Sequence, residues 1–190
     1  MRKRRKTEII VISFRLEGIG LPTLPAQLVE SLLDAVRDLL PPFHLRTALE
    51  PLEEGRVERY WLATVGPDGQ PHLAGLGARW VDGRLYFVSG ARTRKSRNLE
   101  GHPECVISAQ LPELDLALRG VARRVSDEDT VARLAAHWAD TGWPARANGS
   151  AIEADYSAPS AGPPPWDLWV LEPVSAVGVG PAGAMRWRFS

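Results

Sequence analysis

The first quarter of the chain has the periodicity of helices. In residues 24–40, apolar side chains recur every three or four positions, which predicts an amphipathic helix. Thr23 is suited to cap its first turn, and Pro41–Pro42 ends it because proline lacks the N–H that a helix needs. His44–Glu54 predicts a second short helix, broken near Pro51.

The N-terminus begins with a basic run and a short apolar segment. Met1–Lys6 is basic, and Ile9–Phe14 is apolar but ends at Arg15. A signal peptide needs about 7–15 uninterrupted apolar residues and a membrane-spanning helix about 20, so the segment is too short for either. We expect a solvated tail followed by a short strand or a further segment of the tail.

From Tyr60 onward the pattern changes to the alternation of half-buried strands. Turn residues separate the apolar runs, and few helices intervene, which predicts a closed or half-closed antiparallel barrel. The predicted strands are Tyr60–Val65, Gln70–Val81, Arg84–Ser89, Glu104–Gln110, Asp115–Val125, Trp166–Val179 and Ala184–Phe189.

Turn and cap residues mark the connections. Pro67–Asp68–Gly69 predicts a turn, and Asp82–Gly83 predicts a hairpin because both residues tolerate positive φ. Gly120 predicts a bulge or a close approach of backbones. Ser126–Asp127–Glu128 predicts the start of a helix that runs to about Ala139, and Thr141–Pro165 predicts a loop.

The stretch Arg84–Leu99 holds the strongest candidate chemistry. A buried strand leads into a helix that Thr93 is placed to cap, and arginines surround Lys95. A helix N-terminus offers unpaired N–H groups and the positive end of the helix dipole, so it favours an anion. The chain has three lysines and twenty arginines, and Lys95 is the only lysine after Lys6. The stretch therefore predicts a phosphate-binding site.

Composition and charge restrict the class of protein. A length of 190 residues allows one domain with an extension, and the net charge of zero gives no field that would attract nucleic acid or an acidic membrane. Cys105 lies in an apolar run, which predicts a buried, unreactive thiol, and a single cysteine suits a reducing cytoplasm. The spacing of histidines, cysteines and carboxylates predicts no metal site.

Four segments in this order resemble the pyridoxamine 5′-phosphate oxidase-like superfamily, whose members are split β-barrels that bind flavin or deazaflavin. The segments are Tyr60–Val65, Pro67–His72, Asp82–Phe87 and Thr93–Leu99 followed by Pro103. The resemblance implies a mainly β fold, a six-stranded antiparallel split β-barrel over residues 52–190, with residues 1–51 as an N-terminal extension. It also implies a homodimer with two cofactor sites at the subunit interface.

The resemblance places the cofactor along two strands and the phosphate-binding loop. The family's arginine–lysine pair falls on Arg94–Lys95, and the third-strand positions that line the flavin fall on Val88 and Ser89. The second-strand segment along the ring falls on residues 72–77. The implied cofactor-binding residues are His72, Leu73, Ala74, Gly75, Val88, Ser89, Arg92, Thr93, Arg94, Lys95, Asn98 and Trp187.

The chain departs from the true oxidase at its substrate residues. That enzyme has an arginine and a lysine where this chain has His72 and Gly77, and Arg186-Trp-Arg188 replaces its C-terminal arginine–histidine pattern. Both differences argue against pyridoxamine phosphate as the substrate. Trp61–Thr64 and Ser157–Pro165 resemble the actinobacterial branch that uses the deazaflavin coenzyme F420.

Two functions fit these residues. The first is an oxidoreductase that uses F420 or FMN, which the sequence does not distinguish, and the second is a non-catalytic protein that binds a flavin, deazaflavin or haem-like ligand. Small residues at Ala74, Gly75 and Gly77 would let a flat ring approach the backbone. No catalytic residue is assigned, although His72 could donate a proton. Tryptophan or tyrosine could wall the substrate pocket, at Trp166, Trp187 or Tyr156.

Overall fold

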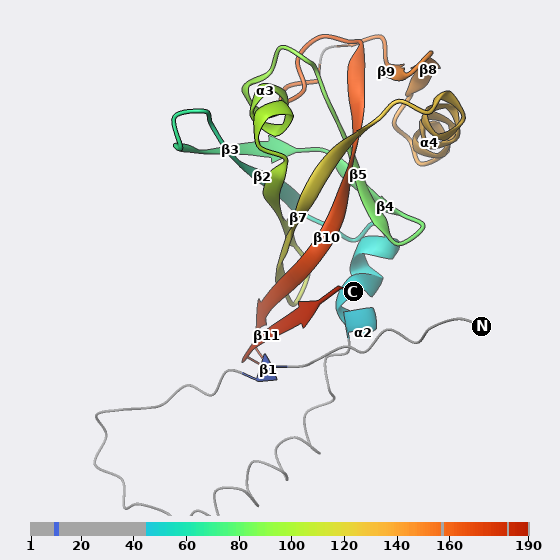
Figure 1. Ribbon diagram of the computed structural model, residues 1–190. Helices are drawn as coiled ribbons and strands as arrows, with labels where there is room; N and C mark the ends of the chain where they lie inside the picture. The colour runs from blue at the N-terminus through green and yellow to red at the C-terminus, as the bar shows by residue number, and fades with distance from the viewer. Residues whose placement is uncertain (1–9, 12–44, 157, 182, 190) are drawn as a thin grey trace, which may run out of the picture.

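The main structural element is an antiparallel sheet of 11 strands (Figure 1). The structure, a computed structural model, describes residues 10–11, 45–156, 158–181 and 183–189. The strands are β1 (Ile10–Val11), β2 (Arg59–Val65), β3 (Pro71–Leu76), β4 (Ala78–Val81), β5 (Arg84–Ser89), β6 (Glu104–Gln110), β7 (Asp115–Val125), β8 (Arg146–Asn148), β9 (Ala151–Glu153), β10 (Trp166–Gly180) and β11 (Gly183–Arg188). The helices are α2 (Leu45–Glu53), α3 (Arg94–Gly101) and α4 (Glu128–Asp140).

The long strand β10 organises the sheet. One edge of β10 pairs with β7 along almost its whole length, while the other edge pairs first with β5 and then with β11. Beyond β7 the order continues β6, β2, β3, whereas β4 pairs only with β5. The sheet curls into a barrel. The barrel stays open between β3 and β4, because these two strands do not pair with each other. This confirms the predicted split β-barrel.

The prediction of one strand over Gln70–Val81 is wrong, because the chain changes partners in the middle. β3 ends with Leu76 opposite Tyr60 of β2, and β4 begins with Ala78 opposite Phe87 of β5. Gly77 is the corner between them. Both strands bury apolar side chains in one interior, so their hydrophobic pattern is continuous and does not reveal the corner.

Helix α2 continues through Pro51 to Glu53, so the expected break at this proline is wrong. Ala48 and Leu52 on either side of it are buried in the barrel core, and this packing holds the last turn in place. The predicted boundary between residues 51 and 52 falls inside this helix. The helix predicted for residues 24–40 lies outside the described residues.

The segment predicted as a loop from Thr141 to Pro165 contains a short hairpin. Strand β8 pairs with β9, and β9 pairs with the start of β10, where Ile152 lies opposite Trp166 and is fully buried. Three-residue strands carry too little alternation to be recognised in a sequence. The short strand predicted near the N-terminus is present in part, since Ile10–Val11 pairs with β11.

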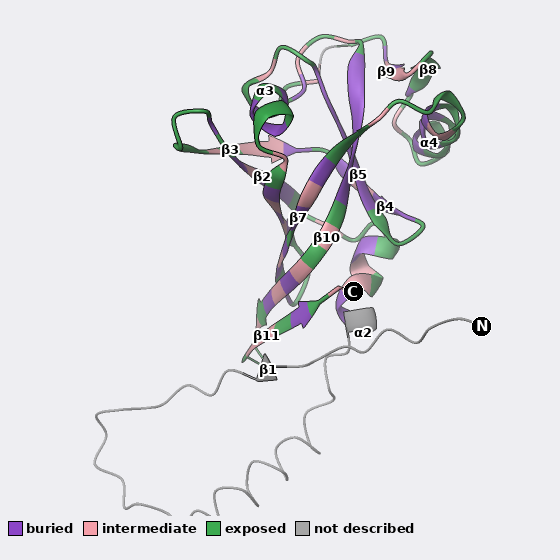
Figure 2. Ribbon diagram, in the orientation of Figure 1, coloured by how far each residue is buried: buried purple, intermediate pink, exposed green. Residues whose placement is uncertain are grey.

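Two groups of buried apolar residues form the core. Figure 2 marks the buried positions along the strands in purple. The first fills the barrel, and the second lies between α4 and the outer side of β5 and β10. Four buried residues attach α4, as its sequence predicts: Val131, Leu134, Ala135 and Trp138. Cys105 is buried in the barrel, where desolvation raises the pKa of its thiol to about 12, so it is unreactive.

The predicted turns are confirmed in their backbone conformations. Asp82 and Gly83 have φ of 51° and 75°, which matches a two-residue hairpin, and Asp127 caps α4 by accepting a hydrogen bond from Thr130 N–H at 2.9 Å. None of the helices in the described ranges is long and apolar enough to cross a membrane.

Candidate functional site

A cluster of three hydroxyl groups joins the end of strand β5 to the start of helix α3. Thr93 caps the helix, because its Oγ1 accepts a hydrogen bond from the backbone N–H of Ser96 at 3.3 Å. The Ser89 hydroxyl lies 2.8 Å from Thr93 Oγ1 and accepts a hydrogen bond from Ser96 Oγ at 2.8 Å. The three hydroxyls therefore fix the end of the strand against the first turn of the helix, as the predicted cap implies.

Lys95 is the most unusual residue of this region. Its side chain is only 2% exposed, and its amine donates a hydrogen bond to the carbonyl oxygen of Ser160. None of the ion pairs among the described residues includes Lys95. Burial lowers the pKa of its amine because a charged group is poorly solvated there. A buried ammonium with two unused N–H donors is suited to bind an anion.

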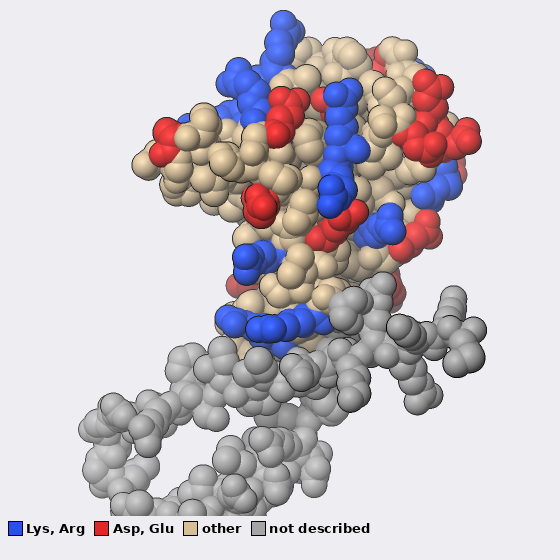
Figure 3. Space-filling view, in the orientation of Figure 1, with Lys and Arg blue, Asp and Glu red and all other residues tan. Residues whose placement is uncertain are grey.

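The arginines around Lys95 are exposed. Arg92, Arg94 and Arg97 all reach solvent, and no carboxylate of the described residues pairs with them. Basic side chains gather at the end of the molecule where α3 lies (Figure 3). A pocket of about 360 Å³ lies beside them, lined by residues 90–93 and 161–165. The structure thus places one buried amine and three exposed guanidinium groups in and beside the first turn of α3, and of these residues Arg92 lines this pocket.

His72 faces the same site from strand β3. It lies opposite Thr64, whose hydroxyl accepts a hydrogen bond from Asn98 Nδ2 at 3.0 Å and so connects β2 to α3. The Nδ1 atom of His72 is buried and has no hydrogen-bond partner in the part of the chain that the structure describes. Desolvation, followed by the positive charges of Arg94 and Lys95, lowers the pKa of His72, so the imidazole is neutral at pH 7.

The other predicted residues divide between two faces of the sheet. Ala74 lies opposite the buried Leu62 and therefore shares the inner face with His72. Leu73 and Gly75 lie on the outer face, where Leu73 is 62% exposed and Gly75 is opposite Trp61. Only their backbone is available to a ligand on the α3 side of β3.

Trp187 is not near these residues, which corrects its prediction as a cofactor ligand. It is fully buried in the barrel core, where its ring packs against Gly178; a Cβ on that glycine would lie 2.9 Å from Cη2 of the indole. Its strand, β11, pairs with the half of β10 that is far from β5 and α3. Trp166 is also fully buried, and its indole N–H donates to Gly162 O at 2.8 Å.

Comparison with known proteins identifies the family. The sequence profile of the pyridoxamine 5′-phosphate oxidase family matches residues 52–174, which is well over half of the chain. The chain belongs to this family. The matched segment contains β2 to β7, α3, α4 and most of β10, and so includes every predicted site residue except Trp187.

Solved structures show the same fold at low sequence identity. A pyridoxamine 5′-phosphate oxidase-related, FMN-binding protein from Nostoc punctiforme is 22% identical, with a TM-score of 0.51 over 78% of this chain and 90% of that one. General stress protein 26 from Bacillus anthracis is 17% identical, with a TM-score of 0.51 over 71% of this chain and 93% of that one. A heme-binding protein from Mycobacterium smegmatis is 21% identical, with a TM-score of 0.52 over 72% of this chain and 54% of that one. No curated protein sequence matches the chain.

This family member also has a pocket that the sequence did not predict. The pocket has a volume of about 340 Å³ and lies between β4, β5, α4 and residues 156–161. Three aromatic side chains line it, Trp138, Trp143 and Tyr156, of which only Tyr156 was predicted to wall a pocket. Val88, predicted to line the flavin, and Arg79 also belong to its lining. In the sequence, the tryptophans near the end of α4 were the only signal for this pocket. The pocket itself was not predictable, because the contact of these tryptophans with β4 depends on the tertiary fold.

Substitution of the cap should loosen the start of α3. We expect Thr93→Ala to lower the free energy of unfolding by about 1 kcal/mol, since it removes the acceptor for Ser96 N–H. Thr93→Ser keeps that acceptor and is the control. Chemical denaturation of the three proteins measures the difference, and equal stability of Thr93→Ala and the parent chain would show that the hydroxyl cluster does not hold the helix.

Proposed function

We propose that the protein is an oxidoreductase that binds FMN or the deazaflavin coenzyme F420 by its phosphate at the start of α3. The observation that carries the proposal is Lys95, a buried amine that pairs with no carboxylate of the described residues. A phosphate beside it would supply the missing negative charge and restore a normal pKa. The family and the FMN-binding relative on this fold support the same class of ligand.

The residues present fit such a coenzyme at both ends. Lys95, Arg92 and Arg94, with the free N–H groups of the first turn of α3, would hold the phosphate. The strand from His72 to Gly77 would lie along the ring system, where the unpartnered Nδ1 of His72 is available for a hydrogen bond. When bound, the coenzyme supplies a ring that accepts or donates hydride.

The protein's own contribution is to bind, orient and exclude water. His72 is neutral at pH 7, so one ring nitrogen can donate a hydrogen bond while the other accepts one. The buried hydroxyls of Ser89 and Ser96 hold the start of α3 in place under the phosphate. The absence of the oxidase's arginine and lysine at His72 and Gly77 supports a substrate other than pyridoxamine phosphate.

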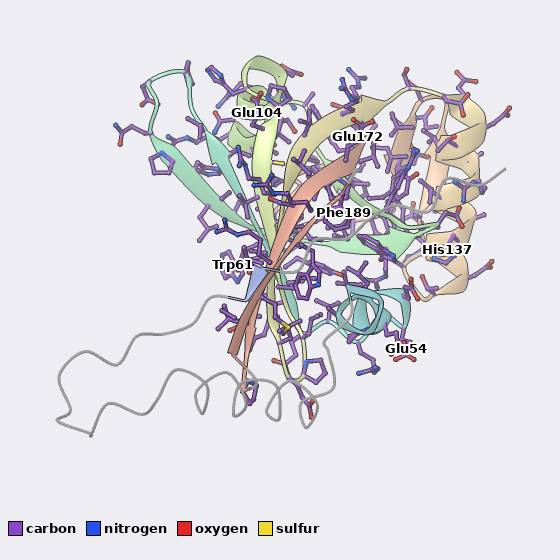
Figure 4. The ribbon with its side chains drawn as sticks, turned by 60° about the horizontal axis from the view of Figure 1, so that its bottom comes forward. Glu54, Trp61, Glu104, His137, Glu172 and Phe189 are labelled. Atoms are coloured by element: carbon purple, nitrogen blue, oxygen red, sulfur yellow. The ribbon has the colours of Figure 1, made fainter. Side chains whose placement is uncertain are left out.

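We propose a homodimer built on the outer face of β2, β3 and β6. Trp61 and Leu73 are 39% and 62% exposed, and Ala63 lies between Leu73 and Val106 in the register of the sheet. Trp61 lies on the opposite side of the molecule from His137 of α4 (Figure 4). An apolar patch of this kind on a sheet supports association with a second copy, which would then close the side of β3 that faces away from α3.

A non-catalytic carrier is the second candidate, because a heme-binding protein shares this fold. The spectrum of protein purified from a host that makes FMN, F420 and haem separates the candidates. An absorbance band at about 450 nm identifies a flavin, one at about 420 nm the deazaflavin, and a strong Soret band with iron in the sample identifies haem. Reduction of a bound flavin or deazaflavin by a hydride donor, and reoxidation by an organic acceptor, supports the enzyme. Protein that binds neither on titration contradicts it.

A further inference from the structure

The pocket between β4, β5, α4 and residues 156–161, here called the aromatic pocket, has the lining of a small-molecule site. Its volume of about 340 Å³ is in the range of ligand pockets, and its apolar wall comes from Val88, Trp138, Trp143 and Tyr156. Trp138 and Trp143 pack edge to face with ring centroids 5.2 Å apart, so their orientation is fixed. A planar apolar ligand matches such a wall.

One positive charge faces this apolar wall. Arg79 is half-buried, lines the pocket, and donates from Nη1 to the carbonyl oxygen of Ala78 at 3.0 Å. Among the ion pairs of the described residues, none includes Arg79. The remaining N–H donors of the guanidinium are therefore available to a ligand.

Two carboxylates on neighbouring segments are already paired with other arginines. Asp155, next to Tyr156, binds Arg146, and Asp82, in the turn after β4, binds Arg133 at 2.9 Å. The pocket therefore offers, beside aromatic rings, a guanidinium that has no counter-ion among the described residues. A guanidinium recognises a carboxylate through two parallel hydrogen bonds, and its geometry suits this better than that of an amine.

We propose that the aromatic pocket binds an aromatic carboxylate, with the carboxylate on Arg79 and the ring against Trp143 and Tyr156. The pocket adjoins the proposed coenzyme site, because Gly77 and Val88 line it, as does Ser160, whose carbonyl oxygen accepts a hydrogen bond from Lys95. That aromatic carboxylates are the substrate class rests on the proposed function. That the pocket binds an aromatic carboxylate does not depend on it.

The test is calorimetric titration of the full chain with 2-naphthoate and with its neutral analogue 2-naphthamide. We expect 2-naphthoate to bind the parent protein at least about tenfold more tightly than 2-naphthamide, since only the carboxylate pairs with Arg79. Arg79→Met should remove this preference, and Arg79→Lys should keep part of it. Arg84→Met is the control, because it removes an exposed arginine of β5 that does not line the pocket. Melting curves verify that each variant is folded.

Two further titrations separate this proposal from the function of the neighbouring site. Lys95→Met should bind 2-naphthoate normally while binding FMN roughly 10- to 150-fold more weakly, and saturating FMN should leave 2-naphthoate binding intact. If the protein binds 2-naphthoate but takes up no coenzyme, the aromatic pocket remains a binding site for aromatic carboxylates and the proposed function is overturned. Equal binding of the two naphthalene probes, unchanged preference in Arg79→Met, or displacement of 2-naphthoate by FMN would overturn the aromatic carboxylate as the substrate class.

Discussion

Lys95→Met is expected to weaken the binding of FMN or F420 by about 1.5–3 kcal/mol, or roughly 10- to 150-fold. The amine is buried and pairs with no carboxylate of the described residues, so its hydrogen bond to a phosphate would form away from bulk water. Methionine has a similar length and no charge, which leaves the packing of the site almost unchanged. Fluorescence or calorimetric titration of the coenzyme-free protein measures the loss.

The matched control is Arg97→Met, which removes one exposed charge from the same helix. Its effect should be within about threefold, because exposed charges contribute little in salt-containing buffer. Similar losses in the two variants would mean that α3 attracts the coenzyme by its overall charge, without a specific contact from Lys95.

The same lysine should make the stability of the coenzyme-free protein depend on pH. The pKa of Lys95 in the folded protein lies below its usual 10.5, so between the two values the unfolded chain binds more protons than the folded one. The free energy of unfolding should therefore rise with pH in that window. Melting temperatures from pH 7 up to about 10.5 test this, and Lys95→Met should lack this rise and be at least as stable as the parent at pH 7.

Gly120→Ala is expected to destabilise the protein by about 1–3 kcal/mol or more, the cost of overpacking a rigid site. A Cβ at Gly120 would lie 2.1 Å from the carbonyl oxygen of Glu172 and 2.9 Å from Cα of Pro173, so only a backbone shift can make room. These residues join β7 to β10, the two strands with the longest pairing in the sheet. Thermal and urea unfolding measure the change.

Gly75→Ala is the comparison, since a Cβ there meets no atom within 4 Å. Its stability should differ from that of the parent chain by less than about 1 kcal/mol. Wild-type stability in Gly120→Ala would show that β7 and β10 separate at this point more easily than their close contact implies.

Local signals predicted the parts of the site that lie close together in the sequence. The Asp82–Gly83 turn and the Thr93 cap depend only on neighbouring residues, and both are present. The burial of Lys95 was not predictable, because its amine donates a hydrogen bond to the carbonyl oxygen of Ser160, 65 positions further along the chain. A basic residue in a basic run has the same sequence signature whether it is buried or solvated.

Longer-range features were missed for the same reason. Nothing in the alternation of Gln70–Val81 distinguishes one strand from two strands that meet at Gly77. The aromatic pocket depends on α4 and β4 meeting in space. Trp187 was predicted as a ligand from its place in the closing strand, yet the small residue Gly178 leaves room for its indole inside the barrel.

The central claim is that the start of α3 binds the phosphate of a flavin-type coenzyme. The direct test is titration of coenzyme-free protein with FMN against riboflavin, and with F420 against 8-hydroxy-5-deazariboflavin, pairs in which only the first member carries phosphate. At least one phosphorylated member should bind about tenfold or more tightly than its partner, and Lys95→Met should reduce that preference about tenfold or more. Equal affinity within both pairs, or an unchanged preference in Lys95→Met, would contradict the account.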